Sequence, residues 1–326
     1  MEEQQEKNIN LADKKEETSE TYNSESTFGK ILIGFLWAIV GVCIAGVTGF
    51  ILLMGAAWGR PLRINGKQIH ADLTKGSNWT RGEKPDVSHL DAATRDALEA
   101  LWLHDAQKEH ASVPAFSRIS WLLVSVGAPA ELLEWSHRAA IEEIEHTQLC
   151  FALAQGYSNS GCSYTVKPMP KLLSGGLDLK ENPLIVLAKE SLSDGCQLED
   201  YNADVAAACA EACEERVTRN VLKQIALEER SHAEFSWRIL EWTLNQSPIQ
   251  VRSAIKQSYK DLEKFKRPTA YSWDKKRLIK KANSELLLKH GRLDDKQWAK
   301  IWDERLVKTK LRLGGLLEFE NEYKQA

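Results

Sequence analysis

The sequence predicts an all-α protein in which a four-helix bundle follows one transmembrane helix and precedes extra helices. Three observations predict it. The pattern Glu-Glu-x-x-His at 142–146 recurs at 228–232, 86 residues further along the chain. A helix break at 127–129, Gly-Ala-Pro, separates two stretches of helical sequence. Residues 31–59 form a run without any charged residue, and this run is long enough to span a bilayer.

The chain begins with a polar segment and continues with the predicted membrane anchor. Residues 1–27 include seven Glu and show no hydrophobic periodicity, which predicts a disordered acidic tail. Residues 28–59 are predicted to form a single transmembrane helix, with Trp37 and Trp58 near its ends as interfacial aromatics. A buried core helix is the alternative, and the length of the apolar run with its glycines argues against it.

Residues 60–86 contain repeated Gly and Asn and predict a turn-rich linker. The basic residues near the anchor are more numerous on its C-terminal side: Arg60, Arg63, Lys67 and Lys75, against Lys30 on the other. The positive-inside rule therefore favours a single-pass membrane protein with its bundle on the cytoplasmic side. The six cysteines include no Cys-x-x-C pair, which argues against a rubredoxin-like or zinc module.

The repeated motif has the spacing of metal ligands. Glu143 and His146 stand three residues apart, so they project from one face of a helix, about 4.5 Å apart along its axis. Glu229 and His232 have the same spacing. One such pair usually marks a solvated helix face, but its repetition favours a shared site. A dinuclear carboxylate site in a four-helix bundle needs one further Glu from each of the other two helices.

A partner glutamate precedes the first motif at a suitable distance. Glu109 lies 34 residues before Glu143, and Gly127 lies close to the midpoint. If the chain reverses at Gly127, the two carboxylates lie at nearly the same height on antiparallel helices.

The second motif has two candidate partners. Glu199 lies 30 residues before Glu229, which predicts a reversal near Glu214, although no Gly or Pro marks it. Glu190 is the rival carboxylate, and its separation of 39 residues fits a hairpin less well.

Residues 109–113 read Glu-His-Ala-Ser-Val. Together with the repeated motif, this segment makes residues 87–245 resemble the ferritin-like superfamily of di-iron carboxylate proteins, in particular bacterial membrane-anchored members. The resemblance implies a ferritin-like bundle over 87–245 with six metal ligands: Glu109, Glu143, His146, Glu199, Glu229 and His232. Pro114 departs from the pattern and predicts a kink in the first helix.

Four buried carboxylates need about two divalent cations to neutralise them, and without metal they would repel one another. The resemblance implies iron, and manganese suits the same ligands. It also implies an oxidoreductase that reacts with dioxygen or peroxide. Non-enzymatic iron binding, oxidation or storage is the alternative, and a vestigial site is a third interpretation. An enzyme would need an external electron donor or a membrane quinol, and no nucleic-acid partner is expected.

Residues around the motif have predicted roles of their own. Glu142, Glu145 and Glu228 lie off the inward face of their helices, so we expect them to be solvated. Asp105 and Asp204, each about one turn from a candidate ligand, are candidates to orient a ligand histidine.

Charge is divided along the chain. Residues 86–245 contain 13 Lys and Arg against 25 Asp and Glu, whereas 246–326 contain 20 against 11. The basic extension 246–326 has helical periodicity, so we expect helices packed on the bundle. A basic surface that binds anionic membrane lipid is the second interpretation.

Overall fold

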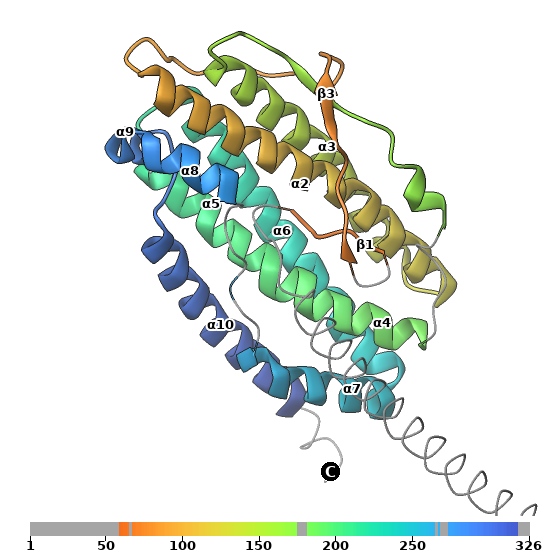
Figure 1. Cartoon of the computed structure of the whole chain (residues 1–326). Helices are drawn as coiled ribbons and strands as arrows, with labels where there is room; N and C mark the ends of the chain where they lie inside the picture. Colours follow the sequence, from red (N-terminus) through yellow and green to blue (C-terminus); the bar gives the residue numbers. More distant parts are fainter. Residues whose placement is uncertain (1–58, 65–66, 175–180, 265–266, 268–272, 319–326) are drawn as a thin grey trace, which may run out of the picture. The chain divides into compact units, whose positions relative to one another are not determined.

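The structure, a computed structural model, describes residues 59–64, 67–174, 181–264, 267 and 273–318. These residues are mainly helical, which confirms the predicted all-α class (Figure 1). The predicted acidic tail and all of the predicted anchor except Gly59 lie outside the described residues. Within the described ranges, no helix combines the length and apolarity that a membrane span requires.

The first hairpin consists of two long helices, α2 (Ala92–Ser125) and α3 (Ala130–Tyr157) (Figure 1). Asp91 caps α2, because its carboxylate accepts a hydrogen bond of 2.9 Å from the backbone N–H three residues on. The helix continues through Pro114. Between α2 and α3, Gly127 has a φ of 68°, which glycine adopts at little cost, and the predicted turn is confirmed.

The second hairpin pairs a three-part helical segment with one long helix. Its elements are α4 (Pro183–Glu190), the π-helix η2 (Ser191–Glu199), α5 (Asp200–Ala212) and α6 (Arg216–Gln246). Asn182 caps α4, because its side-chain oxygen accepts a hydrogen bond of 3.0 Å from the backbone N–H of Leu184. The reversal expected near Glu214 is also confirmed: Glu215 caps α6 by accepting two backbone N–H groups, a role the sequence did not reveal.

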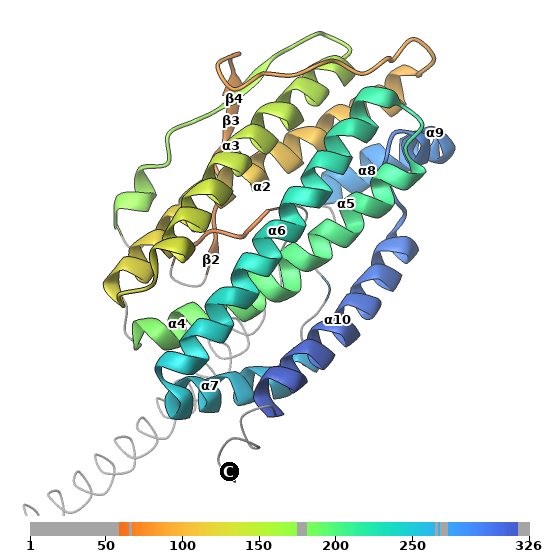
Figure 2. The same ribbon diagram turned by 180° about the vertical axis from the view of Figure 1, so that it is seen from behind.

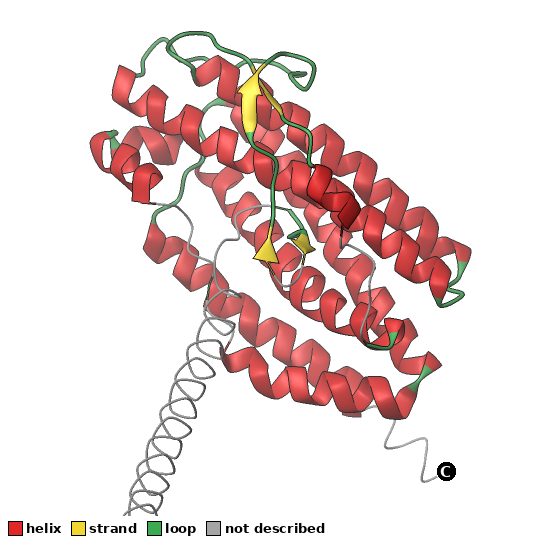
Figure 3. Cartoon of the chain, turned by 45° about the vertical axis from the view of Figure 1, so that its right-hand side comes forward, coloured by secondary structure: helices red, strands yellow, loops and turns green. Residues whose placement is uncertain are grey.

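Short strands lie beside the helices (Figure 3). They are β1 (Arg63–Ile64), β2 (Lys67–Gln68), β3 (Leu73–Lys75) and β4 (Tyr164–Val166), and a 3-10 turn η1 (Pro170–Ser174) follows β4. β1 pairs with β2, and β3 pairs with β4, both antiparallel. The predicted linker 60–86 thus contains β1, β2 and β3. The pairing of β3 with β4 joins the linker to the connection between the two hairpins.

The C-terminal extension forms further helices. They are α7 (Pro248–Asp261), η3 (Leu262–Lys264), α8 (Trp273–Lys281), α9 (Ser284–Lys289) and α10 (Asp295–Glu318). α10 packs on α5 (Figure 2). At this contact Tyr201 meets Trp302 edge to face at 5.1 Å, and Arg305 donates to Asp200 at 3.0 Å. The predicted packing of these helices on the rest of the protein is therefore confirmed.

The two hairpins meet along α3 and α6, and their interior contains two separate apolar clusters. On α2, Trp102 belongs to one cluster and Phe116 to the other, and both are fully buried. A fully buried side chain of this size stabilises the fold by about 1.5–3 kcal/mol. Glu109 lies halfway between them in the sequence, so a polar layer interrupts the core between its two apolar ends.

Candidate metal centre

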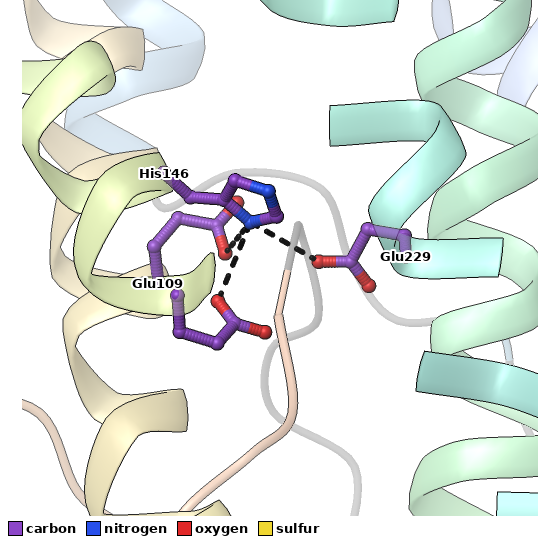
Figure 4. A group of neighbouring side chains, drawn as sticks. Glu109, His146 and Glu229 are labelled. Atoms are coloured by element: carbon purple, nitrogen blue, oxygen red, sulfur yellow. Dashed lines mark ion pairs between the residues drawn. The ribbon is translucent and has the colours of Figure 1, made fainter. Parts of the chain in front are cut away.

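Six polar side chains meet in this layer, each with an exposed fraction of 0%. They are Glu109 on α2, Glu143 and His146 on α3, Glu199 at the end of η2, and Glu229 and His232 on α6. Figure 4 shows Glu109 and Glu229 approaching the ring of His146 from different sides. All six residues singled out in the sequence are therefore placed together.

The six side chains form two groups that could each hold a metal ion. Position 1 is lined by Glu109, Glu143, His146 and Glu229, and position 2 by Glu143, Glu199 and His232. Within each group the potential ligand atoms lie within 4.8 Å of one another. Only Glu143 belongs to both groups, so its carboxylate lies between the two positions.

Distances around the histidines are close to those of ligands on one ion. Nδ1 of His146 lies 3.6 Å from Glu143 Oε2 and 3.7 Å from Glu109 Oε2. Nδ1 of His232 lies 3.4 Å from Glu143 Oε1, the other oxygen of the same carboxylate. Two ligand atoms bound at about 2.1 Å to one ion are at most about 4.2 Å apart. Glu143 therefore presents one oxygen to each position.

The orientation of both histidines is set by glutamates of the opposite motif. Nε2 of His146 lies 2.6 Å from Glu228 Oε2, and Nε2 of His232 lies 2.8 Å from Glu142 Oε2. Each Nε2–H donates to a carboxylate outside the cluster, so a neutral ring turns the lone pair of Nδ1 inward. This crossed pair of hydrogen bonds links α3 to α6 and fixes the tautomer that a metal needs.

The expectation that Glu142 and Glu228 are solvated is therefore wrong. Their side chains are only 22% and 24% exposed, and each accepts a hydrogen bond from a buried histidine. Glu145 is exposed as expected. The helical period places Glu142 and Glu228 off the inward face, but the close packing of α3 on α6 brings each one over the neighbouring helix.

The two aspartates expected to orient a histidine bind arginines instead. Asp105 accepts from Arg292 Nη1 at 2.7 Å, and Asp204 accepts from Arg305 Nε at 2.7 Å. Both arginines belong to the C-terminal extension, so these aspartates hold that extension in place.

Glu199, not Glu190, supplies the carboxylate of the third helical segment. Glu190 pairs with Arg118 and remains 33% exposed, whereas Glu199 is fully buried. Glu199 has a further partner that the sequence did not indicate: Arg60 Nη1 lies 3.3 Å from its Oε2. Burial raises the pKa of Glu199 to about 7, and the Arg60 guanidinium partly offsets that effect.

Burial and neighbouring charges also shift the pKa values of other groups in the cluster. Burial and the neighbouring Glu143 raise the pKa of Glu109 well above its ordinary value, and the pKa of Glu229 is raised for the same two reasons. Burial would lower the pKa of His146, but the adjacent carboxylates of Glu109, Glu143 and Glu228 raise it well above normal. The cluster therefore needs cations, either protons or metal ions, to stay buried.

Comparison of the chain with models of protein families, with curated proteins and with solved structures finds no match. The function is therefore inferred from the geometry and chemistry of the cluster.

Proposed function

We propose that the protein is a membrane-anchored, ferritin-like oxidoreductase with a dinuclear carboxylate centre, most simply di-iron, that reacts with dioxygen or peroxide. Its four-helix bundle comprises α2, α3, the segment α4–η2–α5, and α6. The spacing of the repeated motif, the antiparallel hairpins and the shared interior layer support this proposal.

One observation carries the proposal: nine buried polar atoms of this one cluster have no hydrogen-bond partner among the described residues. They are both carboxylate oxygens of Glu109, Glu143 and Glu229, Oε1 of Glu199, and Nδ1 of His146 and His232. Buried polar atoms in folded proteins nearly always have a partner, and each one left without costs about 1–3 kcal/mol. Divalent cations would satisfy all of these atoms together.

The donor set fits iron and also manganese, because both accept imidazole nitrogen together with carboxylate oxygen. A bound pair of such ions would pass on electrons received from a donor and would offer open coordination positions to dioxygen or peroxide. The chain's own residues do the rest. Glu143 holds the two positions at a fixed separation, and Glu142 and Glu228 keep Nδ1 of both histidines directed inward. The apolar clusters on either side exclude water.

Electrons must come from an external donor, for which a membrane quinol is the candidate, because no Cys-x-x-C pair indicates a redox module within the chain. Iron oxidation or storage is the alternative for the same cluster. The two differ in whether a second substrate is consumed in proportion to dioxygen or peroxide.

The full chain, purified in detergent, should contain two metal ions. His146→Ala or His232→Ala should lower that number to one or none, because each removes the only nitrogen ligand of its position. Helix content should remain, since the apolar clusters are untouched. His137→Ala is the matched control, because His137 lies on α3 as an exposed residue outside the cluster. Mass spectrometry of the metals and circular dichroism measure these outcomes.

A wild-type protein without metal would refute the proposal. If metal is present, consumption of dioxygen or peroxide with a reduced quinol distinguishes the enzyme from a storage protein. Continuous turnover supports the oxidoreductase, and a single round of iron oxidation supports storage.

A further inference from the structure

The segment 59–62, which we call the strap, leads into β1 (Figure 1) and contacts α2 and α5 beside the candidate centre. The backbone oxygen of Arg60 accepts a hydrogen bond of 3.0 Å from Ser112 Oγ on α2. The backbone oxygen of Gly59 lies 3.5 Å from Nδ2 of Asn202 on α5. Leu62 is buried in a small apolar cluster with residues of α2. The strap thus connects the two hairpins through α2 and α5, whereas α3 and α6 contact each other directly.

The strap touches the carboxylate layer itself. Gly59 has a φ of 72°, and a Cβ atom there would lie 2.9 Å from Glu109 Oε2 and 2.3 Å from Ser112 Oγ. No side chain fits in that space, so a glycine is required for the backbone to approach the cluster this closely.

The next residue places a positive charge beside position 2. Arg60 is 3% exposed, and its Nη1 donates to Ser236 Oγ at 3.0 Å and to Glu199 Oε2 at 3.3 Å. Its Nη2 donates to the backbone oxygen of Glu190 at 3.2 Å. The lack of a side chain at Gly195 makes room, because a Cβ there would lie 1.9 Å from Ser236 Oγ and 3.1 Å from Arg60 Nη1.

These contacts make Glu199 unlike the other carboxylates. Its Oε2 is occupied by Arg60 and Ser236, which leaves Oε1 for a metal, whereas Glu109, Glu143 and Glu229 have both oxygens free of hydrogen bonds. Position 1 therefore has three carboxylates. Position 2 has two, one of which already pairs with a cation.

We propose that Arg60 is a positioning residue that makes the two metal positions unequal: position 1 fills first, and Arg60 weakens position 2 by sharing Glu199 and by repelling the second ion. This inference rests on the proposed dinuclear centre. Because the inference concerns the order in which metal ions bind, a metal titration tests it without any measurement of turnover.

The test is titration of the metal-stripped full chain in detergent with Mn²⁺ alone, in which electron paramagnetic resonance counts the free ion. The wild type should bind two ions in two steps, with dissociation constants at least tenfold apart. Arg60→Met removes the charge, so the second step should tighten about tenfold while the first stays unchanged. Arg60→Lys keeps the charge and should preserve the two separate steps.

Arg63→Met is the matched control, because Arg63 also follows the predicted anchor and pairs with a carboxylate of η2, Asp194, outside both positions. It should not change either step. A merely structural role for Arg60 predicts the opposite sign, since a disturbed site would bind Mn²⁺ more weakly in both steps. That result, or an unchanged second step in Arg60→Met, would overturn the inference.

The Mn²⁺ titration of the wild type tests the inference even if Arg60→Met does not fold. Two equal binding steps would overturn the inference and leave the proposed dinuclear centre standing. No binding of Mn²⁺ at all would overturn both. Glu199→Gln assigns the steps: it should weaken the second step alone, and a weakened first step would contradict the order proposed.

Discussion

Removal of a glutamate that holds a candidate ligand histidine should weaken metal binding at one position only. Glu228 accepts a hydrogen bond from Nε2 of His146 at 2.6 Å, and Glu142 accepts one from Nε2 of His232 at 2.8 Å. In Glu228→Ala the imidazole loses this acceptor, so the tautomer with its proton on Nδ1 becomes competitive. That tautomer cannot bind a metal through Nδ1.

The magnitude follows from the exposure of the two glutamates. Partners of this kind contribute about 10–100-fold to metal affinity. Because the side chains of Glu228 and Glu142 are 24% and 22% exposed, water can partly replace them, and we expect the lower end of that range. A tenfold loss corresponds to about 1.4 kcal/mol. Glu228→Ala should weaken position 1 through His146, and Glu142→Ala should weaken position 2 through His232.

The same Mn²⁺ titration of the full chain measures both effects. Glu145→Ala is the control, since Glu145 belongs to the first motif and is exposed. Circular dichroism checks that helix content is retained. The reasoning fails if both alanine variants weaken the same step, or if neither differs from Glu145→Ala, because the crossed hydrogen bonds would then not orient the histidines.

Two further outcomes are expected. Burial raises the pKa of Glu199 to about 7, and burial together with Glu143 raises the pKa of Glu109 and Glu229, so protons compete with metal ions for these carboxylates. Mn²⁺ must displace those protons, so its affinity should rise between about pH 6 and 8. A pH dye should detect the protons released on binding. An affinity that stays constant over this range would contradict the prediction. The full chain should also sediment with membranes, since 31–59 lack charge, and recovery in the soluble fraction without detergent would count against the anchor.

The positions of the six candidate ligands were accessible to sequence reasoning because helical geometry is local. An i, i+3 pair shares a helix face wherever the helix lies, and a turn at Gly127 midway between Glu109 and Glu143 fixes their relative height. The choice of Glu199 over Glu190 also followed from hairpin length. These inferences need only the helical repeat and the chain reversal.

The contacts between elements could not be predicted in this way. The helical period alone predicts that Glu142 and Glu228 are solvated, because it says nothing about how closely the next helix packs. Asp105 meets Arg292 across 187 residues, and Arg60 meets Glu199 across 139. No local pattern encodes such pairs. The π-helical turns of η2, which end at Glu199, likewise have no signature that a 3.6-residue period would reveal.

The sequence repeat and the strap have opposite effects on the centre. The repeat produces near symmetry, since each motif supplies one Glu, one His and the glutamate that orients the other motif's histidine. Glu143 breaks this symmetry because it serves both positions, while Glu229 serves only position 1. Arg60 breaks it further, because it comes from outside both hairpins and reaches only Glu199 among the six candidate ligands. If the centre reacts with dioxygen or peroxide as proposed, a weakly held second ion would leave coordination positions easier to open. Arg60, which we propose controls this inequality, directly follows the predicted anchor, so a displacement of the strap would alter its contact with Glu199 at position 2.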